Sequence, residues 1–99
     1  MDIITLCGSM KFKNEMIGIA ERISLKGYCV LMPVFLERDT ITEEQLANLK
    51  NAHLKRIECA NAILVMNVNN YIGTSTKLEI QYATKLGKKI VYYTDVIKN

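Results

Sequence analysis

The run Ala62-Ile63-Leu64-Val65-Met66 contains no polar residue and decides the fold class of this chain. A continuous apolar run of this length is typical of a strand that is buried on both faces of a parallel sheet. The residues after it, Asn67 to Gly73, are polar and turn-forming, and a helix is predicted from Thr74 to Leu86, with Gly87 as its stop. This strand–turn–helix unit favours an α/β fold with a parallel sheet.

The same alternation of strands and helices extends outward to both ends of the sequence. One predicted helix begins with a capping box, in which Thr42 is the N-cap and Gln45 is the third helical residue. Right-handed crossovers then predict one doubly wound, flavodoxin-like or Rossmann-like domain over residues 1–99, with four parallel strands in the order 2-1-3-4. The remaining predicted elements are strands at Asp2–Cys7, Tyr28–Met32 and Lys89–Tyr93, a helix from the Gly8–Met10 turn to about Lys26, and the capped helix from Thr42 to about Cys59.

Two segments fall outside this alternation. The charged loop Val34–Ile41 follows Pro33, which stops the second strand, and the loop is long enough to fold over a site. The segment Asp95–Asn99 is interpreted either as a frayed tail or as a contact with a partner.

The composition is that of an ordinary globular chain and argues against several classes of function. Apolar residues make up 49% and charged residues 23% of the 99 positions, and the net charge of +3 is too small and too scattered to indicate binding to a nucleic acid polymer. The sequence has no signal peptide and no long apolar segment, so we expect no membrane association and a cytoplasmic location. Its three cysteines lack metal-ligand spacing, so we expect neither a metal nor a cofactor.

Glu79 interrupts the apolar pattern of the predicted helix Thr74–Leu86. At about 100° per residue, one apolar arc covers about half of the helix circumference, and Glu79 falls near the middle of that arc. Ser75 and Thr76 lie on the same face one turn earlier. A carboxylate in this position is either a partner of the helix dipole or a catalytic group held in a semi-apolar pocket. The members of the arc are Leu78, Ile80, Tyr82, Ala83 and Leu86.

A second candidate feature is the turn Gly8-Ser9-Met10-Lys11 after the first predicted strand. A glycine turn that opens a helix presents backbone N–H groups and the positive end of the helix dipole, which suit a phosphate or carboxylate, and Lys11 adds charge. The turn can equally be a plain connection between strand and helix. In the strand order 2-1-3-4, the ligand crevice lies at the carboxyl ends of strands one and three. The topology therefore brings this turn close to the helix that carries Glu79.

The only histidine, His53, lies on the inward stripe of the predicted helix Thr42–Cys59, together with Leu46, Leu49 and Ile57. A single inward histidine is either a satisfied core residue or, where it reaches the crevice, an acid, a base or a donor to a bound nucleobase. We therefore name His53, together with Glu79, as a candidate catalytic residue.

Two motifs resemble the nucleoside 2-deoxyribosyltransferase-like superfamily, which includes deoxynucleoside-monophosphate N-glycosidase-like proteins. They are Cys7-Gly8-Ser9-Met10 at the end of the first strand and Tyr71-Ile72-Gly73-Thr74-Ser75-Thr76-Lys77-Leu78-Glu79-Ile80-Gln81-Tyr82-Ala83 in the last long helix. The resemblance implies a protein that cleaves or transfers the N-glycosidic bond of a 2′-deoxynucleoside or its 5′-monophosphate. It further implies that Glu79 is the nucleophile at C1′, and that the protein forms a homodimer or a larger homo-oligomer.

The resemblance also implies substrate contacts and leaves two functions open. The turn at Gly8-Ser9 is expected to line the nucleoside pocket, and Gly73 and Ser75 are expected to contact the sugar or its 5′-phosphate. Transferases of the superfamily carry an acidic residue, which handles the base, at the position of Gly73. The alternative to an enzyme is therefore a nucleotide-sensing or nucleotide-sequestering domain without turnover. The predicted substrate-binding residues are Gly8, Ser9, Met10, Lys11, Asn67, Gly73, Ser75 and Thr76.

Overall fold

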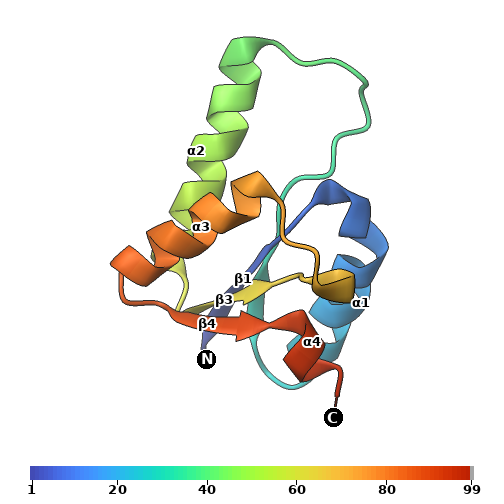
Figure 1. Cartoon of the computed structure of the whole chain (residues 1–99), viewed down its shortest axis with the longest axis vertical. Helices are drawn as coiled ribbons and strands as arrows, with labels where there is room; N and C mark the ends of the chain where they lie inside the picture. Colours follow the sequence, from blue (N-terminus) through green and yellow to red (C-terminus); the bar gives the residue numbers. More distant parts are fainter. Residues whose placement is uncertain (99) are drawn as a thin grey trace.

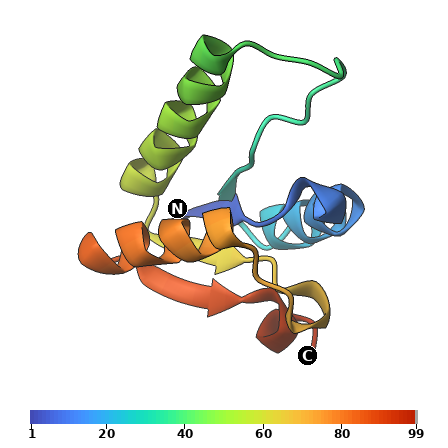
Figure 2. The ribbon, with the colours of Figure 1, turned by 45° about the horizontal axis from the view of Figure 1, so that its top comes forward.

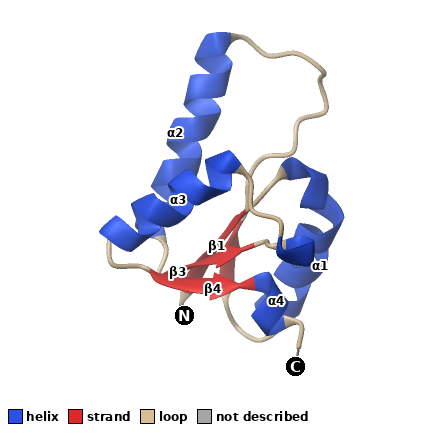
Figure 3. Cartoon of the chain, in the orientation of Figure 1, coloured by secondary structure: helices blue, strands red, loops and turns tan. Residues whose placement is uncertain are grey.

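The computed structural model describes residues 1–98, which form a four-stranded parallel sheet between helices (Figures 1 and 3). The sheet order β2-β1-β3-β4, with every pair parallel, confirms the predicted topology. None of the described helices is long and apolar enough to span a membrane. The elements in chain order are β1 (Ile3–Cys7), the 3₁₀ turn η1 (Met10–Phe12), α1 (Lys13–Ser24), β2 (Cys29–Leu31), α2 (Glu43–Cys59), β3 (Ala62–Val65), the 3₁₀ turn η2 (Val68–Asn70), α3 (Thr74–Lys85), β4 (Lys89–Tyr92) and α4 (Tyr93–Val96).

The inner strand β3 is buried at every position, as its apolar sequence predicts. Alternate side chains of a strand point to opposite faces of a sheet. On one face Leu64 and Met66 pack with the buried side of α1, and Val96 of α4 packs against the same cluster. On the other face Ile63 and Val65 pack with residues of α2 and α3. The sheet therefore holds a core on each face, with α1 and α4 over one and α2 and α3 over the other.

Helix α2 begins with the capping box that its sequence predicts. The Thr42 hydroxyl accepts a hydrogen bond from the Gln45 N–H at 3.1 Å, and the Gln45 side chain accepts one from the Thr42 N–H at 2.9 Å. The C-terminal half of α2 packs on the sheet through Ile57, and the Thr5 hydroxyl of β1 donates to the carbonyl of Arg56 at 2.8 Å. The N-terminal half projects beyond the sheet, and the long loop after β2 leads up to it (Figures 1 and 2).

Helix α3 buries a narrower stripe than the sequence predicts. The predicted arc placed Leu78 and Leu86 on the buried side, but their exposed fractions are 60% and 42%. The buried positions are Thr76 and Ala83, with Ile80 packed beside Ala83. A helix that lies on a sheet contacts it along one such stripe, so residues at the edges of a half-circumference arc face solvent.

The C-terminal segment is not frayed at its start, because Val96 packs against the core, whereas Ile97 and Lys98 are exposed. Strand β4 ends at Tyr92, one residue before the predicted end, and α4 follows directly. The Asn67 side chain donates to the Thr94 hydroxyl at 3.0 Å and accepts from the Thr94 N–H at 3.2 Å. These two bonds tie α4 to the end of β3. Residue 99, the last of the predicted tail, lies outside the described residues.

Candidate functional site

A cleft of about 740 Å³ opens at the carboxyl edge of the sheet. It lies where β1 and β3 end, at the point where the strand order reverses, as the topology predicts. The cleft is lined by α2, α3, the turn after β1 and the loop after β2. The loop contributes Pro33 to Leu36 and Ile41, so the segment that was expected to fold over a site does line the cleft. The volume lies within the range of small-molecule sites, about 300–1,000 Å³.

Glu79 lies on the wall of the cleft that α3 forms. Its side chain is 22% exposed, so it is sheltered by the fold and still open to the cleft. Gly73, in an extended backbone conformation, precedes the helix, and Ser75 and Thr76 in the first turn line the same wall. Thr76 is buried and Ser75 is exposed, so the two hydroxyls do not share one environment.

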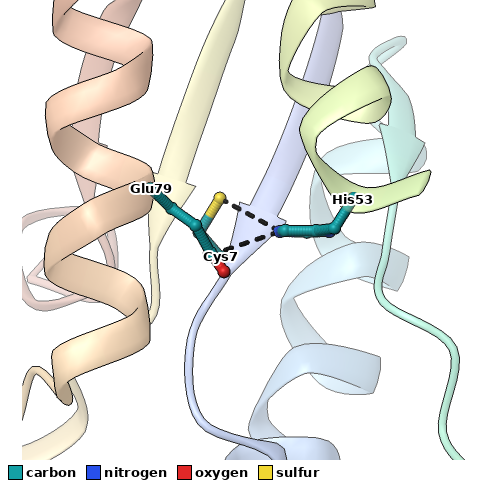
Figure 4. Close-up of side chains that lie close together, drawn as sticks. All are labelled: Cys7, His53 and Glu79. Atoms are coloured by element: carbon teal, nitrogen blue, oxygen red, sulfur yellow. Dashed lines mark hydrogen bonds and ion pairs between the residues drawn. The ribbon is translucent and has the colours of Figure 1, made fainter. Parts of the chain in front are cut away.

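His53 reaches the same point from α2 (Figure 4). It is 9% exposed, as the inward stripe predicts, and its Nε2 lies 3.4 Å from Glu79 Oε1 and 3.5 Å from Cys7 Sγ. Its Nδ1 is buried and has no hydrogen-bond partner among the described residues. Of the two ring nitrogens, only Nε2 has polar neighbours within residues 1–98.

Cys7 is the functional candidate that the sequence did not indicate. It is fully buried at the end of β1. Burial raises the pKa of the Cys7 thiol above its ordinary value, and the charge of Glu79 and a hydrogen bond to Glu79 raise it further. The ligand atoms of Cys7, His53 and Glu79 all lie within 4.8 Å of one another. Spacing along the sequence could not show this cluster, because its members come from three different elements.

The turn after β1 lines the cleft through Gly8, Ser9 and Met10. A Cβ atom at Gly8 would lie 2.7 Å from the Cβ of Met66, so this position requires glycine for close packing. Ser9 caps η1, and its hydroxyl accepts a hydrogen bond from the Lys11 N–H at 3.3 Å. The helix predicted directly after the turn therefore starts as a 3₁₀ turn, and α1 proper begins at Lys13.

Two predicted substrate-binding residues do not line the cleft. The Lys11 side chain folds over the ring of Tyr71, with its Nζ 3.5 Å from the ring centroid, which satisfies its charge by a cation–π contact. Asn67 is occupied by its two hydrogen bonds to Thr94. The other predicted site residues, Gly8, Ser9, Met10, His53, Gly73, Ser75, Thr76 and Glu79, are brought together around the cleft.

Comparison with known proteins assigns this sequence to a family. The sequence matches the model of a domain of unknown function, DUF4406, over residues 5–92. The chain belongs to the DUF4406 family. A search of curated proteins finds no match to this DUF4406 chain.

Among solved structures, the DUF4406 chain is similar to a 2-desoxiribosyltransferase from Leishmania mexicana. The TM-score is 0.67 at 21% sequence identity, and the match covers 94% of this chain and 64% of that one. The chain thus spans less than two thirds of the length of that structure. The likeness confirms the nucleoside 2-deoxyribosyltransferase-like fold that the motifs around Gly8 and Glu79 predict.

The charge of the cleft in the DUF4406 chain comes mainly from residues that the sequence did not single out. Lys13, Lys50 and Arg56 line it. Glu79 is the only carboxylate in the lining formed by residues 1–98. Three basic side chains against one acidic group favour a negatively charged ligand.

Proposed function

We propose that this protein cleaves or transfers the N-glycosidic bond of a 2′-deoxynucleoside 5′-monophosphate or of the nucleoside itself, with Glu79 as the nucleophile. The observation that carries the proposal is the position of Glu79 in the cleft, 3.4 Å from His53 and across from the turn at Gly8. The fold is that of a structure described as a 2-desoxiribosyltransferase, which agrees with this chemistry.

The reaction needs one carboxylate that attacks and is later released. An oxygen of Glu79 forms a bond to C1′ while the C1′–N bond breaks, and the base leaves with the electron pair and takes up a proton. In the second step water or a nitrogen of another base attacks C1′ and gives up a proton, the bond between C1′ and Glu79 breaks, and the Glu79 carboxylate is freed. Attack by water gives hydrolysis, and attack by a base gives transfer.

His53 is the residue that we assign to orient the carboxylate and to handle the proton. Its Nε2 contacts Glu79 at 3.4 Å, and its position on α2 is fixed by the packing of Ile57 and by the Thr5–Arg56 hydrogen bond. The Nε2 atom contacts both Glu79 and Cys7, and it is the ring nitrogen to which we assign the proton transfer. A neutral imidazole can thus hold Glu79 without neutralising its charge.

The cleft favours the 5′-monophosphate over the nucleoside. The first turn of the 12-residue helix α3 supplies backbone N–H groups and the hydroxyl of Ser75, which suit a phosphate. Lys13, Lys50 and Arg56 add positive charge along the same cleft. The apolar loop residues Val34 and Phe35 provide a surface for the base.

The test is the release of free base from a panel of deoxynucleosides and their 5′-monophosphates, followed by chromatography. Wild-type protein is expected to release base, and Glu79→Gln is expected to reduce the rate by about 10³-fold or more, since the amide is no nucleophile. Glu44→Gln makes the same change on the exposed surface of α2, outside the cleft, and is expected to match wild type. The absence of base release from the whole panel, or equal release by Glu79→Gln, would contradict the proposal.

A second candidate is a nucleotide-binding domain without turnover. It is favoured by the absence of a second carboxylate from the cleft within residues 1–98, because a carboxylate pair is the usual device for protonating a leaving group in glycosidic cleavage. Stabilisation of the protein by nucleotides in a thermal-shift experiment, without any product, would support this function over the enzyme.

A further inference from the structure

The thiol of Cys7 lies next to the contact between Glu79 and His53. We infer that Cys7, His53 and Glu79 form a three-ligand binding site for Zn²⁺ at the floor of the cleft. The site joins the end of β1, the middle of α2 and the second turn of α3 (Figure 4). Each residue offers one ligand atom, and these three atoms lie within 4.8 Å of one another.

Two of the three separations between the ligand atoms agree with the edges of a zinc tetrahedron, and the third, from Cys7 Sγ to Glu79, is no more than 4.8 Å. With Zn–N and Zn–O bonds of about 2.0–2.2 Å and a Zn–S bond of about 2.3 Å, tetrahedral angles place neighbouring ligand atoms about 3.3–3.6 Å apart. The Nε2 of His53 lies 3.4 Å from Glu79 Oε1 and 3.5 Å from Cys7 Sγ. A charge-assisted N–H···O bond would instead bring the histidine and the carboxylate to about 2.7–2.9 Å. The separation of His53 Nε2 and Glu79 Oε1 is thus closer to that of two ligands of one metal ion than to that of a charge-assisted hydrogen bond.

The donor set selects for zinc over magnesium or calcium. A thiolate and an imidazole are soft and borderline ligands, whereas Mg²⁺ and Ca²⁺ prefer oxygen atoms alone. A Zn²⁺ ion together with one thiolate, one carboxylate and a neutral imidazole has no net charge, which suits a buried position. On binding, the thiol proton passes to solvent as the Zn–S bond forms.

The proposed zinc site has an open fourth position on the cleft side. His53 and Glu79 both line the cleft, whereas Cys7 lies beneath it, fully buried. Three protein ligands with a fourth place for water or a bound molecule are typical of zinc sites that are not purely structural. Binding of the metal through Nε2 places the ring proton of His53 on Nδ1, which has no hydrogen-bond partner within residues 1–98.

Zinc binding and nucleophilic attack use the same carboxylate and exclude each other. Zn²⁺ bound to Glu79 neutralises the charge that would attack C1′, so the metal is expected to inhibit base release. The zinc site does not depend on the proposed activity. It can be tested without any nucleotide, and the base-release experiment can be run in a chelator.

The direct experiment is titration of the metal-free full chain with Co²⁺, an optical probe for tetrahedral zinc sites, and then with Zn²⁺ against a chromophoric chelator. We expect one equivalent of Co²⁺ to give a thiolate charge-transfer band and visible bands of tetrahedral intensity, and Zn²⁺ to displace it. Cys7→Ser is expected to abolish the charge-transfer band, and Glu79→Gln to weaken Zn²⁺ binding by at least about tenfold. Cys59→Ser removes an exposed cysteine at the end of α2 and is the matched control.

Each outcome decides the question. Loss of the band in Cys7→Ser but not in Cys59→Ser supports the site. If Cys7→Ser does not fold, Glu79→Gln is the deciding variant, because the Glu79 side chain is partly exposed. Absence of a charge-transfer band, a band that survives in Cys7→Ser, or Zn²⁺ affinity unchanged in Glu79→Gln would overturn the inference. Base release in chelator together with absent metal binding would reject the zinc site and leave the proposed function standing.

Discussion

A side chain at position 8 has no room, because Gly8 after β1 lies against Met66 after the neighbouring strand β3. A Cβ at Gly8 would meet the Cβ of Met66 at 2.7 Å and the end of Met16 at 3.1 Å. The first contact involves an atom fixed to the backbone, which cannot move aside as the tip of a flexible side chain does. The closeness of this turn to the sheet is what places Ser9 and Met10 at the rim of the cleft.

We therefore expect Gly8→Ala to destabilise the protein by about 1–3 kcal/mol through overpacking. Gly18→Ala is the matched control, since its Cβ would meet nothing within 4 Å in the middle of α1. That change is expected to stabilise the protein by about 0.5–1 kcal/mol, because alanine favours a helix interior. Urea unfolding of both variants checks the prediction, and equal stabilities of the two would contradict it.

Cys7 and Cys59 provide a second comparison at the scale of single residues. Burial raises the pKa of the Cys7 thiol, and the charge of Glu79 raises it further. A raised pKa lowers the thiolate fraction at every pH below it, and the thiolate is the reactive form. In a chelator, from about pH 7 to pH 9, folded protein is expected to be alkylated at the exposed Cys59 and spared at Cys7, with both modified in urea. Mass spectrometry of peptides reads the result, and equally fast modification of Cys7 in the folded protein would refute it.

Helix α2 carries His53, and its N-terminal half projects from the sheet (Figure 2). We therefore expect the stability of α2 to depend on its capping interactions more than the stability of α1 or α3 does. Its N-terminus is held by the reciprocal hydrogen bonds of Thr42 and Gln45. Because the first half of the helix has little core beneath it, the cap is the main local interaction that fixes where the helix begins.

Thr42→Ala is expected to cost about 0.5–2 kcal/mol of stability and to fray the start of α2. Thr40→Ala, an exposed position in the loop just before the cap, serves as the control and is expected to change stability by less than about 0.5 kcal/mol. Thermal unfolding gives the stability difference, and hydrogen exchange shows where the helix opens. A loss for Thr40→Ala as large as that for Thr42→Ala would argue against the cap.

At the scale of the whole molecule, the exposed apolar residues are consistent with self-association. Leu46 on α2 and Val34 and Leu36 on the loop are exposed around the mouth of the cleft, and Ile17 is exposed on α1. Tyr92 and Tyr93 are partly buried and pack against the core clusters, so they contribute less to such a surface. We expect light scattering to give at least twice the chain mass of 11.3 kDa. A monomeric mass at micromolar concentration would contradict this prediction.

The sequence predicted the strand order, the approach of the Gly8 turn to the helix that carries Glu79, and the inward position of His53, because these follow from periodicity and the rules of parallel sheets. It did not predict that Cys7 lies beside His53 and Glu79. A strand that is buried on both faces has no alternation of polar and apolar residues to show which side chain faces α2. It also missed Arg56 and the cleft-lining lysines Lys13 and Lys50, because long flexible side chains have no periodic signal of what they reach. Lys11 and Asn67 do not line the cleft, because Lys11 contacts the ring of Tyr71 and Asn67 is hydrogen-bonded to Thr94.

The central claim is that Glu79 faces the anomeric carbon of a bound nucleotide. The most direct measurement is a crystal structure of Glu79→Gln with a deoxynucleoside 5′-monophosphate, in which the substituted side chain keeps its shape and turnover is blocked. The account predicts C1′ about 3–3.5 Å from the side-chain oxygen or nitrogen of residue 79, with the phosphate at the start of α3. A nucleotide bound in the cleft with C1′ turned away from residue 79, or bound elsewhere, would contradict it.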